Sequence, residues 1–169
     1  MPVGEMQDLL DTMPQVGTLD WIGLRPGRRQ ALQPVPEADL NEESGLQGDH
    51  YRGRSRKRQV TLIQAEHIQA VAKILDKPGI DPGLLRRNLV VSGINLLALK
   101  DRRFSIGDLI LEGTGHCHPC SRMEENLGAG GYNAMRGHGG LTAKVVKGGT
   151  IRLGDEVKLV LAEPTSANK

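Results

Sequence analysis

Short segments in which apolar and polar residues alternate make up most of the chain, and glycine-containing turns separate them. Residues 104–114 and residues 150–161 show this pattern most clearly, and each segment reverses at a Gly-Asp pair. A third reversal, at a Gly-Gly pair, joins residues 141–147 to residues 150–153. Strands with a two-residue period and tight turns are typical of a barrel or a sandwich. We therefore predict a mainly β fold in which these three turns close hairpins.

Other segments of the chain lack this alternation. Residues 60–63 and residues 89–91 are continuously apolar and predict buried strands. Between them, the apolar positions of residues 68–75 recur with helical spacing, and Pro78 and Gly79 end the pattern. This segment predicts a helix that packs on the outside of the barrel.

Asp81 and Pro82 predict a short capped helix in front of the next strand, and this helix delivers Arg86, Arg87 and Asn88 to the start of that strand. Arg87 lies at the edge of an apolar segment, where a partly desolvated cation needs an anionic partner. Either a bound phosphate or a carboxylate such as that of Asp49 would meet this need.

A further helix is predicted over residues 122–127, because Ser121 and Glu124 have the spacing of a capping box and Gly128 supplies a stop. Cys120 directly precedes the cap. Unpaired amide groups and the helix dipole favour an anion at this position, so we expect Cys120 to react as a thiolate.

The length of 169 residues suits one domain, and 38% hydrophobic with 25% charged residues is typical of a globular protein. We expect residues 17–163 to form this domain, with an N-terminal flank over 1–16 and a tail over 164–169. Four aromatic residues and a net charge of +2 argue against a nucleic-acid partner. No leader and no membrane span are visible, and we expect a cytoplasmic location.

Reactive side chains concentrate in residues 116–120, with the sequence His-Cys-His-Pro-Cys. Three interpretations are open: a zinc site, a dithiol redox pair, and a single cysteine that binds a metal cofactor or carries sulfur. Zinc needs four ligands and would have to recruit His50 and His138. A redox pair usually starts a helix beside a βαβ unit, and hairpins surround this one. Cys117 also suits a small buried core position.

Two further groups of residues suit anions. Residues 52–58 hold five cations, which alone are typical of a solvated loop. Residues 136–140 form a glycine-rich segment around His138 and Gly139, which lets the backbone approach a ligand closely. It lacks the lysine of a phosphate-binding P-loop. His67, at the flank of the predicted helix, is expected to be solvated.

Several segments, taken in order, carry a resemblance to a known family: GLQGDHYRG (residues 45–53), RQVTLI (58–63), LLRRNLVVSGINL (84–96), FSIGDLILEGT (104–114), HPCSRME (118–124) and GGTIRLGDEVKL (148–159). Together they resemble the MOSC domain, the C-terminal domain of molybdenum cofactor sulfurases, which also exists as free-standing bacterial proteins. The resemblance implies a MOSC-type β-barrel with a few short peripheral helices. It also implies binding of molybdenum cofactor (molybdopterin).

The family cysteine, which is thought to ligate molybdenum or to carry sulfur, matches Cys120. We therefore expect Cys120 to be both the catalytic residue and the molybdenum ligand, since a thiolate is a soft ligand. The predicted cofactor-binding residues are Arg87, Asn88, Asp49, His50, Thr114, Arg122, His138 and Gly139. Among them, Arg87 is the candidate for the pterin phosphate, with electrostatic help from the basic run. The resemblance assigns no role to Cys117.

Two functions follow from the resemblance. The first is a molybdenum-dependent reductase of N-hydroxylated compounds, which detoxifies base analogues and takes electrons from a separate donor protein. The second is a carrier of sulfur or of molybdenum cofactor, loaded by a cysteine-desulfurase-type donor and without turnover of its own. No flavin, haem or iron–sulfur motif is visible, so a reductase would need a donor partner. Its candidate proton donors are His118, His138 and Asp49.

Overall fold

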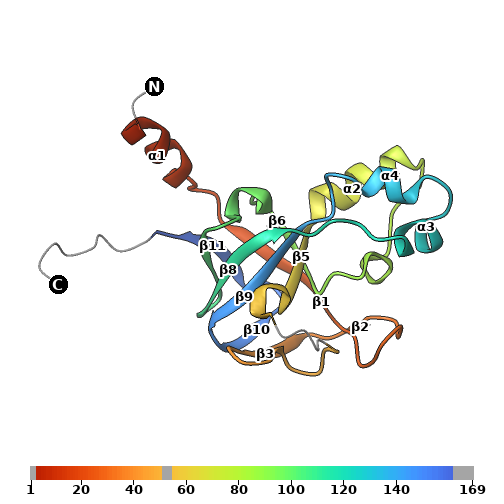
Figure 1. Ribbon diagram of the computed structural model, residues 1–169, viewed down its shortest axis with the longest axis horizontal. Coiled ribbons are helices and arrows are strands. Elements are labelled where there is room, and N and C mark those ends of the chain that lie inside the picture. Colours follow the sequence, from red (N-terminus) through yellow and green to blue (C-terminus); the bar gives the residue numbers. More distant parts are fainter. Residues whose placement is uncertain (1–2, 51–54, 162–169) are drawn as a thin grey trace, which may run out of the picture.

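A closed barrel of seven strands forms the body of the protein in a computed structural model, which describes residues 3–50 and 55–161 (Figure 1). Around the barrel the strands follow the order β11-β7-β8-β9-β5-β6-β1, and β1 closes the ring by pairing with β11. Neighbouring strands are antiparallel except for the parallel pair β5 and β6. The strands are β1 (Gly17–Leu24), β5 (Val60–Gln64), β6 (Leu89–Ser92), β7 (Arg103–Ile106), β8 (Leu109–His116), β9 (Leu141–Lys147) and β11 (Glu156–Val160). The prediction of a mainly β barrel is confirmed.

Four further strands extend this arrangement. The two-residue strand β2 (Gln33–Pro34) continues the barrel sheet beyond β1. A separate small sheet has the order β10-β3-β4, with β10 (Gly149–Arg152), β3 (Glu37–Asn41) and β4 (Gly45–Leu46). Both of its pairings are antiparallel, and its residues Ala38, Leu40, Leu46 and Ile151 belong to the barrel core.

The three predicted hairpins have different outcomes. The β7–β8 hairpin forms as expected, with Ile106 opposite Leu109. The other two predictions are wrong, because β10 pairs with β3 and not with β9 or β11. The turn residues do reverse the chain at both places, but each reversal carries it from one sheet into the other. A side chain at Gly148 would collide with the carbonyl oxygen of Leu40, so this glycine allows the approach to β3.

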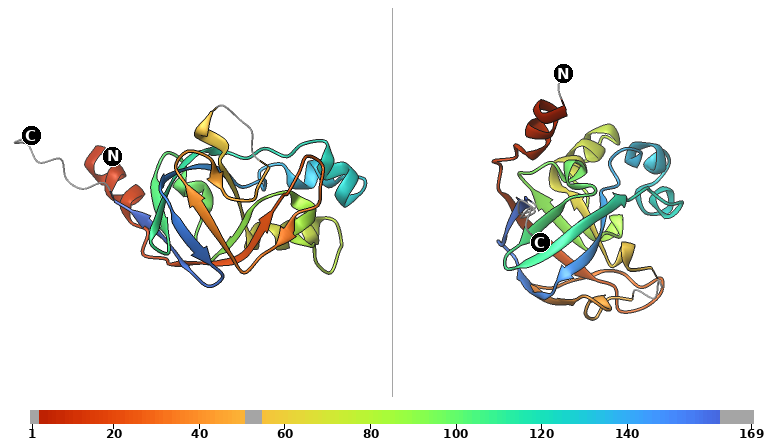
Figure 2. Two further views of the ribbon diagram at one scale, coloured as in Figure 1. Left: turned by 90° about the horizontal axis from the view of Figure 1, so that it is seen from below. Right: turned by 60° about the vertical axis from the view of Figure 1, so that its left-hand side comes forward.

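Helices lie at both ends of the barrel in the described part of the chain (Figures 1 and 2). Helix α1 (Val3–Asp11) projects at one end, and α2 (Ala65–Ile74), α3 (Arg122–Leu127) and α4 (Gly131–Met135) gather at the other. Short 3₁₀ turns are η1 (Arg56–Arg58), η2 (Pro82–Leu85) and η3 (Leu96–Leu99). The predictions of α2, of a turn capped by Asp81 and of a helix over residues 122–127 are confirmed.

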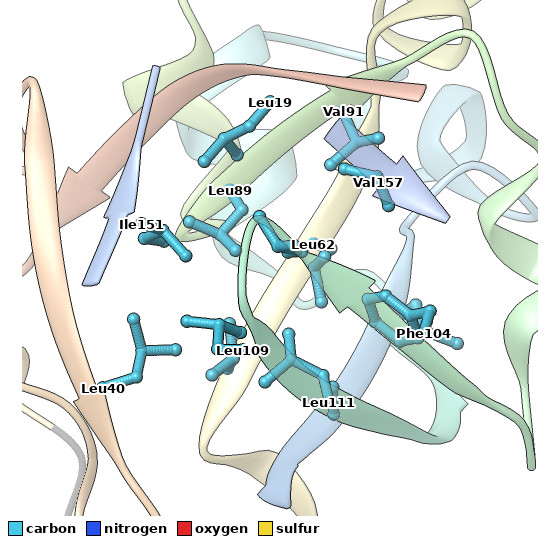
Figure 3. Packing of buried hydrophobic residues seen from close by; sticks show 14 of the residues in the cluster. Leu19, Leu40, Leu62, Leu89, Val91, Phe104, Leu109, Leu111, Ile151 and Val157 are labelled. Atoms are coloured by element: carbon cyan, nitrogen blue, oxygen red, sulfur yellow. The ribbon is translucent and has the colours of Figure 1, made fainter. Parts of the chain in front are cut away.

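The core has two parts. The larger part fills the barrel with aliphatic side chains and Phe104, and Figure 3 shows how strands from both sheets contribute to it. The smaller part lies between the barrel wall and the helices at one end, where Ile63 and Val90 meet Val71, Met123 and Met135. This second cluster fixes α3 and α4 against the barrel, and with them the segment that carries the cysteines.

The cap of α3 differs from the predicted capping box. The Ser121 side chain makes no capping hydrogen bond. Instead, the two carboxylate oxygens of Glu124 accept hydrogen bonds from the amides of Gly130 and Tyr132, each at 2.9 Å. Glu124 thus reaches forward to the start of α4, because the turn at Gly128 brings those free amides within its range.

Within residues 3–50 and 55–161, none of the helices has the length and apolar character that crossing a membrane requires.

Candidate functional site

The cysteine segment begins where β8 ends. His116 is the last paired residue of β8, opposite Leu141, and the next amide, that of Cys117, donates to the carbonyl oxygen of Gly140 at 2.8 Å. The Cys117 side chain is buried, as predicted for a small core residue, whereas that of Cys120 is exposed. Cys120 lies just before α3, and its carbonyl oxygen accepts from the amide of Met123. The two cysteines therefore differ in access although they are three residues apart.

Arg87 fixes the cysteine segment by hydrogen bonds from its side chain. Its side chain is only 5% exposed, and its guanidinium donates to four carbonyl oxygens. Nε donates to Gly139 at 2.7 Å, and Nη1 donates to Leu85 at 3.2 Å. Nη2 donates to His118 at 3.2 Å and to Cys117 at 3.5 Å. The planar guanidinium suits this role, because its donors reach several separate segments of the chain at once.

Gly139 explains why the glycine-rich segment passes so close to the cysteines. A β-carbon on Gly139 would collide with the carbonyl oxygen of Cys117 and would contact Nη2 of Arg87. The residue is buried, and its own carbonyl oxygen is the acceptor for Arg87. At Gly139 this backbone approaches the cysteine segment closely, and the predicted approach to a ligand stays a prediction.

Asn88 and Asp49 form a second, polar network beside Arg87. The Asn88 side chain donates to Asp49 Oδ1 at 3.0 Å and to the Gly23 carbonyl at 3.2 Å, and its own oxygen accepts from Thr61. The same Asp49 oxygen accepts from the amide of Arg25 at 2.8 Å. Asp49 thus binds Asn88 and the backbone of Arg25. It is not a carboxylate partner of Arg87, which donates to carbonyl oxygens instead.

Five arginines gather beside the cysteine segment, and we call them the arginine cluster: Arg25, Arg58, Arg86, Arg87 and Arg122. Burial lowers the pKa of Arg86 and of Arg87, and the charges of neighbouring arginines of the cluster lower it further. The negative charge of Cys120 raises the pKa of both, and that of Cys117 raises the pKa of Arg87. These effects require short distances between the charged groups.

The positive charge of the arginine cluster is not matched by carboxylates. None of the ion pairs within residues 3–50 and 55–161 includes a member of the cluster. Arg58 instead points Nη2 at the sulfur of Cys117, at 3.9 Å. The Nε atom of Arg25 is buried and has no hydrogen-bond partner in the described protein. Arg58 is exposed and the other four arginines are at least partly buried. An anionic ligand would compensate this group of cations, which has no carboxylate partner within the described residues.

The remaining predicted residues lie around this centre. His50 donates its amide to the Arg25 carbonyl at 2.6 Å. Arg122 is the first residue of α3, and its charge acts on Arg86. Thr114 lies farther back on β8, where its hydroxyl contacts that of Thr142 at 2.8 Å and donates to the Lys57 carbonyl. Of the basic run, residues 51–54 are outside the described residues.

His138 contacts a neighbour that the sequence did not suggest. Its ring packs edge-on against that of His67 in α2, with 5.2 Å between the centroids, and its Nδ1 lies 3.0 Å from the Ala134 carbonyl. His67 is half-buried and not solvated as expected, because the ring of His138, three residues after α4, packs against it. Burial lowers the pKa of His67, and the His138 charge lowers it further.

The zinc interpretation finds no ligand set here. Among the described residues, no three side chains of His, Cys, Asp or Glu gather as a metal site of that kind requires. The surroundings of the two cysteines are also not those of a βαβ unit, since β8, a loop and the short helix α3 follow one another. The interpretation best supported by the residues present is therefore a single accessible thiol beside an anion-binding surface.

Sequence reasoning missed Arg25 and Arg86 as site residues. Arg86 precedes the predicted Arg87 and has a left-handed backbone, with φ at 60°, which turns its side chain from the core position of its neighbour. Arg25 follows β1, more than sixty positions before Arg86 and Arg87 in the chain, and its backbone contacts with Asp49 and His50 join it to them. No local sequence pattern predicts such a contact.

This site belongs to a recognisable class: residues 45–158 match the family model described as the MOSC domain. Because the match covers more than half of the chain, the protein belongs to the MOSC family, as the sequence resemblance predicted. The family is associated with molybdenum cofactor and with molybdenum-dependent redox chemistry.

Solved structures of bacterial proteins share the fold. YuaD from Bacillus subtilis is 18% identical with a TM-score of 0.75, and the match covers 88% of this chain and 97% of YuaD. YiiM from Escherichia coli is 18% identical with a TM-score of 0.65, covering 86% of this chain and 71% of YiiM. YiiM from Geobacillus stearothermophilus is 14% identical with a TM-score of 0.70, covering 86% and 75%. A comparison with curated protein sequences gives no significant match.

Proposed function

We propose that this protein binds molybdenum cofactor, with the Cys120 thiolate as the metal ligand, and reduces N-hydroxylated compounds. The observation that carries the proposal is the arginine cluster, without carboxylate partners among the described residues, beside a segment that holds one exposed thiol. Molybdopterin offers the matching features, because it is an anion with a phosphate group and its metal accepts a soft thiolate ligand.

Different members of the arginine cluster have different roles in this proposal. Arg86 and Arg122 are half-buried and free of carboxylates in the described residues, so they are suited to hold the phosphate. Arg87 has its donors directed at carbonyl oxygens, so its main contribution is to position the segment that carries Cys120. Its predicted contact with the phosphate stays a prediction.

The cofactor, when bound, supplies two-electron reduction of an N–O bond. The balanced reaction converts a hydroxylamine, two electrons and two protons into an amine and water. Electrons come from a separate donor protein. Of the three candidate proton donors, His118 is exposed and lies two residues before Cys120, whereas an Asp49 oxygen is already shared by Asn88 and Arg25. We therefore assign proton delivery to His118.

A test compares Cys120→Ser with Cys117→Ser after expression in a molybdenum-replete host. Cys120→Ser should lose most of the bound molybdenum and the reduction of 6-hydroxylaminopurine, because a hydroxyl is neither a soft ligand nor an anion at neutral pH. Cys117→Ser, the matched control three residues away, should keep its molybdenum. Metal analysis and an assay with dithionite-reduced methyl viologen give the two readouts. Equal molybdenum content in wild type and Cys120→Ser would reject ligation by Cys120.

The same samples separate the reductase from the carrier. If the wild type reduces no N-hydroxylated compound but carries one additional sulfur atom on Cys120 by mass spectrometry, the carrier function replaces the reductase. The expected result is turnover without a persulfide on Cys120.

A further inference from the structure

A basic cleft lies on the outside of the barrel, next to the candidate site. It has a volume of about 410 Å³ and lies between η1 and the middle of β9. Its lining contains four cations and no carboxylate: Ser55, Arg56, Lys57, Arg103, Lys144, Val145 and Val146. We call this surface the basic cleft.

The charges of the basic cleft are only partly compensated. Glu112 forms ion pairs with both Lys144, at 3.2 Å, and Arg103, at 3.6 Å, so one carboxylate serves two cations. The Glu42 carboxylate accepts hydrogen bonds from the amides of Glu42 and Gly148, which lower its pKa, and the nearby Arg56 charge lowers this pKa further. Lys57 takes part in none of the ion pairs found in the described residues. The cleft therefore keeps an excess of positive charge at an exposed surface.

The basic cleft and the cysteine segment share one structural element. Within η1, Arg56 and Lys57 line the cleft, and the next residue, Arg58, directs Nη2 to the sulfur of Cys117 at 3.9 Å. On β9, Lys144 lies three residues from Leu141, which pairs with His116 beside Cys117. At the rise of a β-strand this separation is roughly 10 Å. A protein bound over the cleft would lie beside the cysteines without filling the space around Cys120.

We propose that the basic cleft is the docking surface for an acidic electron-transfer protein. The inference rests on the proposed reductase function, which needs electrons from a separate donor. Complexes between electron-transfer proteins are small and short-lived, and complementary surface charge guides their formation. An excess of exposed lysine and arginine, beside the segment that carries the cysteines but not part of the arginine cluster, has the charge and the place that such an encounter requires. Each donor molecule loses one electron, and two deliveries with two solvent protons complete one N–O reduction.

The test uses molybdenum-loaded protein and compares a protein donor with a small one. The protein donor is an acidic flavodoxin kept reduced by its reductase, and the small donor is dithionite-reduced methyl viologen. The variant is Arg56→Glu combined with Lys57→Glu. The control is Lys73→Glu combined with Lys77→Glu, two exposed lysines around α2 with the same total charge change. Rates are expressed per bound molybdenum, and the readout is the ratio of kcat/KM for flavodoxin to that for methyl viologen.

We expect this ratio to fall by about tenfold or more in the cleft variant, because charge reversal removes electrostatic steering. In the control variant it should stay within about twofold of wild type, since remote surface charges matter little beyond a Debye length. The flavodoxin rate of wild type should fall with added salt, and that of the cleft variant should not. Direct binding of flavodoxin at low ionic strength should show the same difference between the variants.

The outcomes that overturn the proposal are distinct. An unchanged ratio in the cleft variant, or no binding of flavodoxin by wild type at low ionic strength, rejects the docking surface. Turnover with methyl viologen but none with flavodoxin also rejects it. Binding of labelled single-stranded DNA that is lost in the cleft variant, with an unchanged flavodoxin ratio, assigns the cleft to nucleic acid instead. Absence of turnover with methyl viologen rejects the reductase function itself, while the binding measurement still decides on the docking surface.

Discussion

At the scale of single residues, Arg87 connects the fold to the site. It carries a positive charge into a position that is 5% exposed, and the cost of that burial is offset by carbonyl oxygens and not by a carboxylate. The carbonyls belong to η2, to the cysteine segment and to the glycine-rich segment, which are far apart in the chain. Replacing the guanidinium therefore affects three segments together.

Substitution of Arg87 by Ala should destabilise the protein strongly. Four carbonyl oxygens lose a charged donor, and at least some of them stay buried, so we expect a loss of about 3 kcal/mol in the free energy of unfolding. Arg87→Lys should recover only part of this loss, because an ammonium group cannot reproduce the fork. Urea denaturation of the purified variants measures both. Arg136→Ala, at an exposed position, is the control and should change the free energy by less than about 0.5 kcal/mol. A loss of similar size at both positions would contradict the positioning role of Arg87.

At the scale of elements, the sequence predicted local features better than partners. Alternation and the Gly-Asp pair were sufficient for the β7–β8 hairpin, because its strands are neighbours both in the chain and in the sheet. The turns before and after β10 look similar, but β10 pairs with β3, which lies more than a hundred residues earlier in the chain. A turn fixes where the chain reverses, whereas the partner of a strand depends on which side chains complete the core.

In the candidate site, too, local motifs were predictable and contacts between distant segments were not. The positions of Cys120 and Arg87 in one region were predictable, because each lies in a segment that resembles the family, and Gly139 was singled out by its glycine-rich segment. Arg25 was not predictable, since it joins the arginine cluster only through the backbone contacts that Asp49 and His50 make with it. The capping role predicted for Glu124 was wrong. The spacing of a capping box indicates only which residues can reach one another, and here the start of α4 offers free amides to the Glu124 carboxylate.

Glu124 should make the joint between α3 and α4 sensitive to acid. Hydrogen bonds from the amides of Tyr132 and Gly130 lower the pKa of its carboxyl group from the ordinary value of 4.5. A group whose pKa is lower in the folded state adds stability above its unfolded pKa and loses that contribution as pH falls through the folded pKa. Glu124→Gln should therefore lower the melting temperature at pH 7, and the difference from wild type should shrink when the pH falls below 4.5.

The measurement is a series of thermal unfolding curves for wild type and variant between neutral pH and acid. Glu125→Gln is the matched control, because Glu125 is exposed, lies one residue away and makes none of the side-chain hydrogen bonds found in the described residues. It should not reproduce this pH-dependent difference. A difference between Glu124→Gln and wild type that is constant with pH would show that the carboxylate charge is not what binds the two amides.

At the scale of the whole molecule, the two ends of the barrel have different roles. The end with α2, α3 and α4 carries the cysteine segment and the second core cluster. At the opposite end, α1 projects with Met6, Leu9 and Leu10 exposed, and the Arg102 side chain links it to the barrel by hydrogen bonds to Asp11 and to the Leu10 carbonyl. The barrel itself closes there through two residue pairs, which join Gly17 to Val157 and Thr18 to Glu156, and through hydrogen bonds between Leu19 and the turn at Gly154 and Asp155.

Two truncations should separate the contribution of α1 from that of the barrel seam. Removal of residues 1–12 deletes α1 and its contacts with Arg102, so the melting temperature should fall by no more than about 4 °C, as expected for loss of surface interactions worth about 1 kcal/mol. Removal of residues 1–18 also deletes Met13, which packs against the core, and the two pairs of β1 with β11. This opens the ring and exposes the edge of β11, so we expect a fall of roughly 10 °C or more and a tendency to associate through that edge. Trp21, on β1 and packed against the second core cluster, reports the change by fluorescence, and light scattering reports association. If both truncations melted at the same temperature, the barrel would not depend on closure between β1 and β11, and the boundary predicted at residue 17 would have no physical basis.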